Sequence, residues 1–117
     1  MDMNRETEKT QHDAVICLGI NCRRNGSPEL LERLQQLLSQ DETFQIKHHL
    51  CFGACDFAPN IVVVPDRLWY SLVEPEHMED IAAAMQKGED LPGLANHVRS
   101  IVRNAVFSML EAKRDQR

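Results

Sequence analysis

Every cysteine of this 117-residue chain belongs to one of two closely spaced pairs. Four residues separate Cys17 from Cys22, and three separate Cys51 from Cys55. Structural zinc sites usually draw on cysteines that are two residues apart, so these gaps are wider than a zinc knuckle requires. Four thiolates at this spacing suit a larger inorganic centre. The centre that we expect is a 2Fe–2S cluster bound by all four cysteines.

Other uses of four cysteines stay open at this point. A tetrahedral zinc site does not strictly require the shorter spacing, and it would make the chain a zinc-stabilised interaction module. Disulfides would need an oxidising compartment, but residues 1–11 are polar and lack the apolar core of a secretory signal, so we expect a cytoplasmic protein. A Rieske centre would use His48 and His49, which four well-spaced cysteines make unnecessary.

The composition is that of a single domain with an acidic balance. Hydrophobic residues make up 43% of the chain and charged residues 26%, and the formal net charge is -5. An oxidised 2Fe–2S cluster with four thiolates would add about two more negative charges. Nucleic-acid binding needs a basic face, so we expect no nucleic acid and a protein partner instead. No apolar run approaches the ~20 residues that span a bilayer, so we expect no membrane insertion.

Each cysteine pair follows a predicted strand. Residues 14–16 are apolar and lead into Cys17, while residues 43–48 alternate as in a second strand. Ser27 is the expected helix N-cap, with a proline after it as the first helical residue. A right-handed parallel crossover would bring both cysteine pairs to one edge of the sheet. The helix between the strands carries an apolar stripe: Leu30, Leu31, Leu34, Leu37 and Leu38.

A hairpin and a second helix follow. Residues 61–64 and 68–73 are predicted as antiparallel strands, in which Trp69 faces one side of the sheet and Tyr70 the other, one ring in the core and one on the outer face. Pro75 opens a helix that Gly88 ends. The predicted order is therefore β-α-β-β-β-α.

A further amphipathic helix is expected after Gly93, before a solvated tail at 111–117. Its apolar stripe comprises Leu94, Val98, Ile101, Val102, Ala105 and Met109, widened by Phe107 and Leu110. Such a stripe must be covered, and we expect this helix to contribute to a homodimer, with docking on its own sheet as the alternative. The predicted organisation is a flexible leader at 1–12, a domain at 13–88 and a C-terminal helical extension at 89–117.

The segments CLGINCRRNGS at 17–27 and CFGACDFAPN at 51–60 resemble the thioredoxin-like 2Fe–2S ferredoxins. That family includes the small iron–sulfur subunit of NADH:quinone oxidoreductase and relatives in NAD-linked hydrogenases and formate dehydrogenases. The resemblance covers about residues 13–88. It implies an α/β thioredoxin-like fold, with a mixed four-stranded sheet and flanking helices. It also implies cluster ligation by Cys17, Cys22, Cys51 and Cys55 and makes a homodimer plausible.

The resemblance implies a one-electron carrier that is not an enzyme on its own and that exchanges electrons with a reductase or flavoprotein. Only about a dozen residues precede the first strand, which favours a free-standing ferredoxin. The alternative is an electron-transfer subunit of a flavin- and NAD-linked hydrogenase or dehydrogenase.

Basic residues adjoin the cysteines of this acidic chain. Arg23 and Arg24 follow Cys22, and Lys47, His48 and His49 precede Cys51. Positive charge near a cluster raises its reduction potential, and it also suits a docking rim for an acidic partner. Ordinary solvated side chains are the alternative. The remaining histidines show no spacing pattern and are expected at the surface: His12, His77 and His97.

Overall fold

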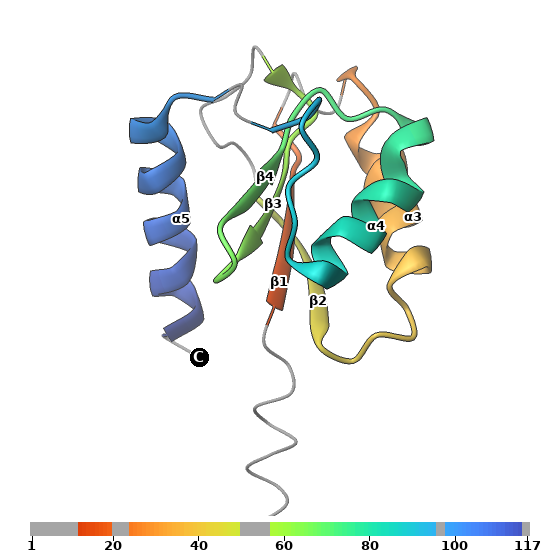
Figure 1. The fold of residues 1–117 in the computed structure, drawn as a ribbon, viewed down its shortest axis with the longest axis horizontal. Coiled ribbons are helices and arrows are strands. Elements are labelled where there is room, and N and C mark those ends of the chain that lie inside the picture. The colour runs from red at the N-terminus through yellow and green to blue at the C-terminus, as the bar shows by residue number, and fades with distance from the viewer. Residues whose placement is uncertain (1–11, 20–23, 50–56, 96–97, 116–117) are drawn as a thin grey trace, which may run out of the picture.

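A four-stranded sheet forms the centre of the molecule, with helices on both faces (Figure 1). The computed structural model describes residues 12–19, 24–49, 57–95 and 98–115. The strands lie in the order β2-β1-β3-β4; β1 runs parallel to β2, and β3 is antiparallel to β1 and β4. Their bounds are β1 His12–Cys17, β2 Phe44–His49, β3 Ile61–Val64 and β4 Leu68–Tyr70.

Helices α3 and α4 lie on one side of the sheet and α5 lies on the other (Figure 1). The predicted order of strands and helices is confirmed, as is the α/β class with a mixed four-stranded sheet, flanking helices and an additional C-terminal helix. The helices are α3 Ser27–Leu37, the short 3-10 helix η2 Pro75–His77, α4 Met78–Lys87 and α5 Ser100–Asp115.

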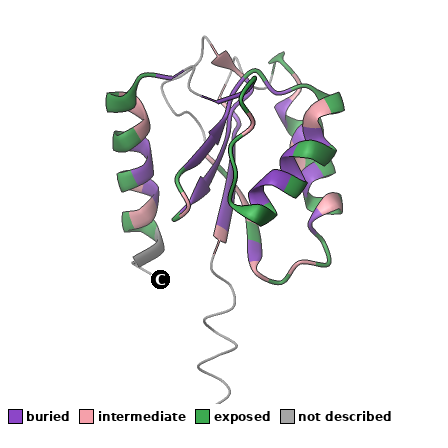
Figure 2. Ribbon diagram, viewed as in Figure 1, coloured by how far each residue is buried: buried purple, intermediate pink, exposed green. Residues whose placement is uncertain are grey.

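The sheet face toward α3 and α4 carries the core that the periodicity predicts. Alternate residues of β1 and β3 point to this face, and the leucine stripe of α3 and the apolar stripe of α4 cover them. Strands β1, β3 and β4 are buried along most of their length, whereas in β2 only Phe44 is buried, and the helices expose their outer sides (Figure 2). The main contributors are Ala14, Ile16, Leu30, Leu34, Ile61, Val63, Ile81 and Met85.

The opposite face of the sheet is a second buried layer rather than an outer surface. Trp69 and Tyr70 do point to opposite faces, as predicted, but they are only 1% and 0% exposed. Helix α5 covers the Trp69 side, and the Phe107 ring meets the indole edge-on with centroids 5.7 Å apart. The expectation that one ring faces outward is therefore wrong, because α5 packs over it.

Helix α5 begins later than predicted, and only part of the predicted stripe faces the sheet: Val98, Val102, Phe107, Met109 and Leu110 pack there. Leu94 lies in a turn, where its carbonyl oxygen accepts the Ser71 N–H at 2.8 Å instead of starting a helix. Ile101 is 82% exposed and Ala105 is exposed, although both were placed on the buried stripe. The side chains of α5 that are buried against the sheet are Val106, Phe107 and Leu110.

Helix α5 continues to Asp115, which corrects the start of the predicted solvated tail at residue 111, although Ala112 and Lys113 are exposed as expected. Glu111 accepts two hydrogen bonds from the guanidinium of Arg67, at 3.0 and 2.9 Å. Arg67 lies in the β3–β4 turn, and its guanidinium carbon is 5.7 Å from the centroid of the Phe107 ring. Helix α5 thus docks on its own sheet, which was the alternative to a helix shared between two copies.

His12 is part of the sheet and not a free surface residue, contrary to the prediction. Its ring stacks on Phe44 with centroids 4.7 Å apart, and its Nδ1 lies 2.7 Å from Oδ1 of Asp66. Gly88 ends α4 beside the same aspartate, and its φ of 75 is a conformation that glycine adopts without strain. These contacts close the end of the sheet farthest from Cys17.

The predicted division into leader, domain and C-terminal extension stays a prediction. Strand β1 already begins at His12, and residues 1–11 lie outside the described part of the chain. Among the described helices, none has both the length and the apolar character needed to cross a bilayer.

Replacing Phe107 with alanine should lower the free energy of unfolding by about 3 kcal/mol, because it leaves a cavity between α5 and Trp69. Chemical denaturation followed by circular dichroism measures this loss. Ile101→Ala is the matched control on the same helix, and its effect should stay within about 0.5 kcal/mol because Ile101 is exposed. Equal losses in the two variants would show that α5 does not dock through this face.

Candidate functional site

Strand β1 carries Cys17 to the edge of the sheet where β1 and β2 both end. Cys17 is the last residue of β1 and is 2% exposed. In the parallel register it lies beside His49, the last residue of β2, and the N–H of Leu18 donates to the His49 carbonyl oxygen at 2.7 Å. The predicted parallel pairing is therefore confirmed, and Cys51 follows His49 by only two residues in the sequence.

Three predicted ligands lie outside the described residues: Cys22, Cys51 and Cys55. The convergence of all four thiolates therefore stays a prediction. The described elements do fix the points at which the chain leaves and re-enters this edge. These points are Cys17, His49 and the segment that begins at Phe57.

Asn60 joins three strands at the point where the chain re-enters the sheet. Its carbonyl oxygen accepts the N–H of Cys17 at 3.1 Å. Its side-chain oxygen Oδ1 accepts hydrogen bonds from Nε1 of Trp69 at 3.0 Å and from the hydroxyl of Ser71 at 2.9 Å. Asn60 is 1% exposed, so this is a buried polar network. This network was not predicted from the sequence, where its one signal is a polar residue placed directly before the most apolar strand.

The chain beyond β4 holds the segment that follows Cys55. The N–H of Leu72 donates to the carbonyl oxygen of Phe57 at 2.9 Å, and the N–H of Val73 donates to that of Pro59 at 3.3 Å. These two backbone N–H groups therefore donate to the segment 57–59 and not to β3. This is why β4 is shorter than the predicted strand at 68–73.

Helix α3 begins differently from the predicted N-cap at Ser27. The capping residue is Gly26, which has a φ of 96 and whose carbonyl oxygen accepts the N–H of Leu30 at 3.1 Å. Glycine reaches this left-handed conformation without the steric cost of a Cβ. Ser27 is therefore the first helical residue and makes no capping bond. Its hydroxyl oxygen is buried and has no hydrogen-bond partner in the structure.

A hollow of about 110 Å³ lies on the Cys17 side of the sheet, beside α5. Lys47 reaches across it, and its Nζ lies 2.9 Å from Oδ2 of Asp13, whose side chain is only 3% exposed. Arg24 is exposed just before α3, so described residues supply part of the basic surround that the sequence predicted. The hollow is lined by Asp13, Val15, Lys47, His48, His49, Val64, Leu110 and Lys113.

Shifted pKa values in the described residues come from contacts that support the fold. Burial raises the pKa of Tyr70, whose hydroxyl donates to the Glu89 carbonyl oxygen at 2.6 Å. The hydroxyl of Thr43 donates to Asp41 and lowers the pKa of that carboxyl. Neither arrangement is that of a general acid or base.

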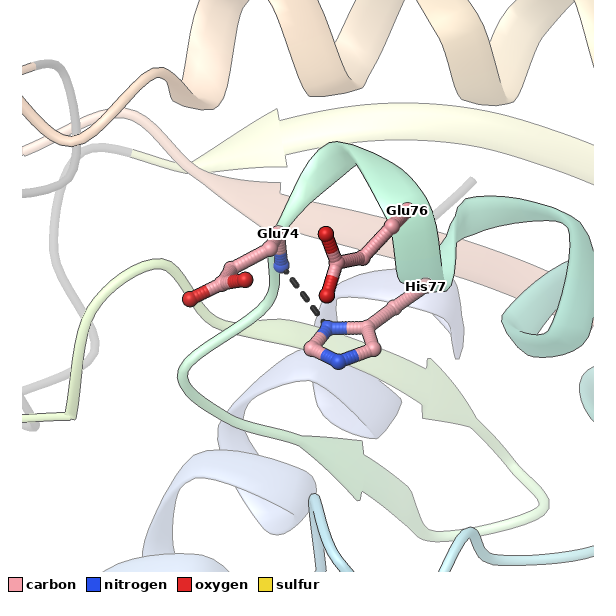
Figure 3. Close-up of side chains that lie close together, drawn as sticks. All are labelled: Glu74, Glu76 and His77. Carbon is pink, nitrogen blue, oxygen red and sulfur yellow. Dashed lines mark hydrogen bonds between the residues drawn. The ribbon is translucent and has the colours of Figure 1, made fainter.

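A second group of metal-ligating side chains lies at the start of α4. Glu74, Glu76 and His77 offer ligand atoms within 4.8 Å of one another (Figure 3). However, Nδ1 of His77 accepts the backbone N–H of Glu74 at 3.0 Å, and both glutamates are exposed. The group therefore closes the turn that precedes α4, and we assign no metal to it.

Known proteins identify the family. The family model for thioredoxin-like 2Fe-2S ferredoxins matches residues 2–86, the greater part of the chain. The chain belongs to the thioredoxin-like 2Fe-2S ferredoxin family. A 2Fe-2S ferredoxin of Aquifex aeolicus (strain VF5) is 32% identical over 72 residues, which are 58% of this chain and 65% of the relative. The match to that relative thus spans slightly less than two thirds of its length.

A further relative and a solved structure agree with this family. A 2Fe-2S ferredoxin of Clostridium pasteurianum is 29% identical over 93 residues, covering 68% of this chain and 89% of the relative. The crystal structure of the Aquifex aeolicus thioredoxin-like 2Fe-2S ferredoxin has a TM-score of 0.66 and 27% identity, covering 72% of this chain and 94% of that one. The predicted thioredoxin-like fold is confirmed, and membership of the family implies a 2Fe–2S cluster.

The described residues of this ferredoxin are compatible with such a cluster at the Cys17 edge. A buried thiol stands at the end of a parallel strand pair, a buried hydroxyl without a partner opens α3, and the basic side chains lie on an otherwise acidic protein. An anionic iron–sulfur group is stabilised by hydrogen-bond donors and positive charge of this kind. The family gives no support to the alternative of a zinc-stabilised module.

Replacing Asn60 with alanine should lower the free energy of unfolding by about 3 kcal/mol, since it leaves the buried donors of Trp69 and Ser71 without an acceptor. Ser71→Ala removes only one donor and should cost about 1 kcal/mol. Equilibrium denaturation of the two variants tests the network. A smaller loss for Asn60→Ala than for Ser71→Ala would show that Asn60 is not its centre.

Proposed function

We propose that this ferredoxin is a one-electron carrier that holds a single 2Fe–2S cluster through Cys17, Cys22, Cys51 and Cys55. The observation that supports this ligand set is the parallel register of β1 and β2. It makes the chain leave the sheet at one edge after both Cys17 and His49. When bound, the cluster accepts and releases a single electron. The chain itself supplies thiolates and their positioning, and no catalytic chemistry of its own.

The protein contributes a rigid and locally positive surround. Backbone hydrogen bonds from β2 and Asn60 fix Cys17 and Leu18, so the thiolate keeps its place between oxidation states. Arg24, exposed just before α3, adds positive charge at this edge, whereas the charge of Lys47 is balanced by Asp13. Positive charge there stabilises the extra electron, which raises the reduction potential.

Positive charge at this edge also suits the docking of an acidic redox partner. The chain carries a formal net charge of -5, so the exposed Arg24 sets this edge apart from the average surface. Complementary charge speeds association and orients the partner. The proposed partner is a reductase or flavoprotein with an acidic surface. In the subunit alternative this partner stays bound, and co-purification with a flavoprotein would reveal it.

A cytoplasmic location and a homodimer are further parts of the proposal. Ligation by four thiolates needs reduced cysteines, which the cytoplasm maintains. Support for the homodimer now rests on the family resemblance, because the apolar face of α5 is already covered by its own sheet. Light scattering on the full chain decides the oligomeric state.

Replacing any one of the four cysteines with alanine should leave three thiolates and a labile cluster. Visible absorbance and iron per chain measure the loss for each variant. Val15→Ala is the matched control, because it trims a buried residue of β1 without removing a ligand and should keep the full cluster. A cysteine variant with a full, stable cluster would remove that residue from the ligand set. A colourless wild-type protein that binds zinc would overturn the cluster itself.

Reversing the charge of Arg24 to glutamate should lower the reduction potential and slow electron exchange with an acidic partner. The charge reversal should make the free energy of cluster reduction less favourable by about 1 kcal/mol at low salt. The effect should be smaller at high salt, because Arg24 is exposed. Lys87→Glu is the control, since this exposed residue precedes Gly88 at the opposite end of the sheet. Potentiometry and stopped-flow kinetics compare the two variants. Equal changes in potential and rate for the two variants would show that Arg24 acts only as an ordinary surface charge.

A further inference from the structure

The hydroxyl of Ser27 is buried without a hydrogen-bond partner. Ser27 is 0% exposed, and its Oγ is one of the few buried side-chain atoms in the described residues that lacks a partner. A hydroxyl withdrawn from water in this way destabilises the fold relative to alanine, which would fill nearly the same space. Capping does not explain it, because Gly26 caps α3 and no side-chain capping bond is present.

The place of Ser27 in the fold points to the edge that carries Cys17. Ser27 shares the buried face of α3 with Leu30 and Leu34, which pack against the sheet. Because α3 connects two parallel strands, it runs antiparallel to them, and its first turn lies at the edge where β1 and β2 end. Figure 1 shows this end of α3 beside that edge.

The first turn of α3 also favours negative charge. The first N–H groups of a helix have no partner within it, and they give its N-terminus a partial positive charge. Helix α3 has 11 residues, enough to sustain this effect, and Pro28 removes one of the N–H donors. Ser27 offers a hydroxyl donor from the same turn, on the buried side.

We infer that the Ser27 hydroxyl donates a hydrogen bond to a sulfur atom of the 2Fe–2S cluster or of one of its cysteine ligands. This inference rests on the proposed cluster and deepens it by naming a residue that tunes it. The reduced cluster carries one more negative charge than the oxidised cluster, so a donor to its sulfur strengthens on reduction. Ser27 therefore raises the reduction potential.

Two pairs of proteins, each differing by one hydroxyl, test the inference: wild type against Ser27→Ala, and Ser27→Thr against Ser27→Val. Potentiometric titration of the loaded proteins should show a lower potential for the alanine and valine members. The equilibrium constant for reduction should fall by about fivefold to tenfold, the effect of one hydrogen bond. Resonance Raman spectra in heavy water should show a smaller shift of the iron–sulfur bands in the members without the hydroxyl.

Ser39→Ala is the matched control, because Ser39 lies beyond the other end of α3 and its exposed hydroxyl donates to the Gln36 carbonyl oxygen at 3.0 Å. Its potential should equal that of the wild type. Equal potentials within both Ser27 pairs would overturn the inference while leaving the cluster in place. Failure of the proposed function is distinct, since the wild type would then contain no iron. If Ser27→Thr or Ser27→Val disturbs packing, the comparison of wild type with Ser27→Ala still tests whether the hydroxyl raises the reduction potential.

Discussion

The parallel pairing of β1 with β2 is the constraint on which the arrangement at Cys17 depends. Side chains alternate along a strand, so a slip of one residue would move each side chain of β1 into the core on the other face of the sheet. Two features oppose such a slip. Val15 and Cys17 face the α5 side while their neighbours fill the other core, and Lys47 reaches the buried carboxylate of Asp13. The ion pair thus contributes to register.

Asn60 carries that order into the rest of the sheet. Asn60, just before β3, accepts hydrogen bonds from Cys17 at the end of β1, from Trp69 in β4 and from Ser71 just after β4. Buried networks of this kind hold one geometry, because any displacement leaves donors without acceptors. A carrier gains from such rigidity, since a site that moves little between oxidation states exchanges electrons with little reorganisation.

Local patterns were sufficient to predict most elements, and long-range contacts explain what they missed. The apolar run Ile61–Val64 predicted a strand correctly, and its burial on all sides is typical of a sheet covered on both faces. The start of α5 and the exposure of Ile101 could not be predicted, because the Leu94 carbonyl oxygen accepts the Ser71 N–H and because Phe107 packs on a tryptophan far away in the sequence. For the site, the cysteine spacing predicted the family. The sequence carried no signal strong enough to predict the role of Asn60 or of the buried Ser27 hydroxyl, which lacks a hydrogen-bond partner.

Because Trp69 is buried, its fluorescence reports on the structure around it. It is the single tryptophan of the chain, it is 1% exposed, and its indole N–H is bonded to the residue whose carbonyl oxygen holds Cys17. The Phe107 ring of α5 covers the same indole. Tryptophan emission therefore responds to undocking of α5 and to disturbance of β1 at Cys17. An iron–sulfur chromophore at that edge would quench this emission by energy transfer, so the intensity would follow cluster loading without any added label.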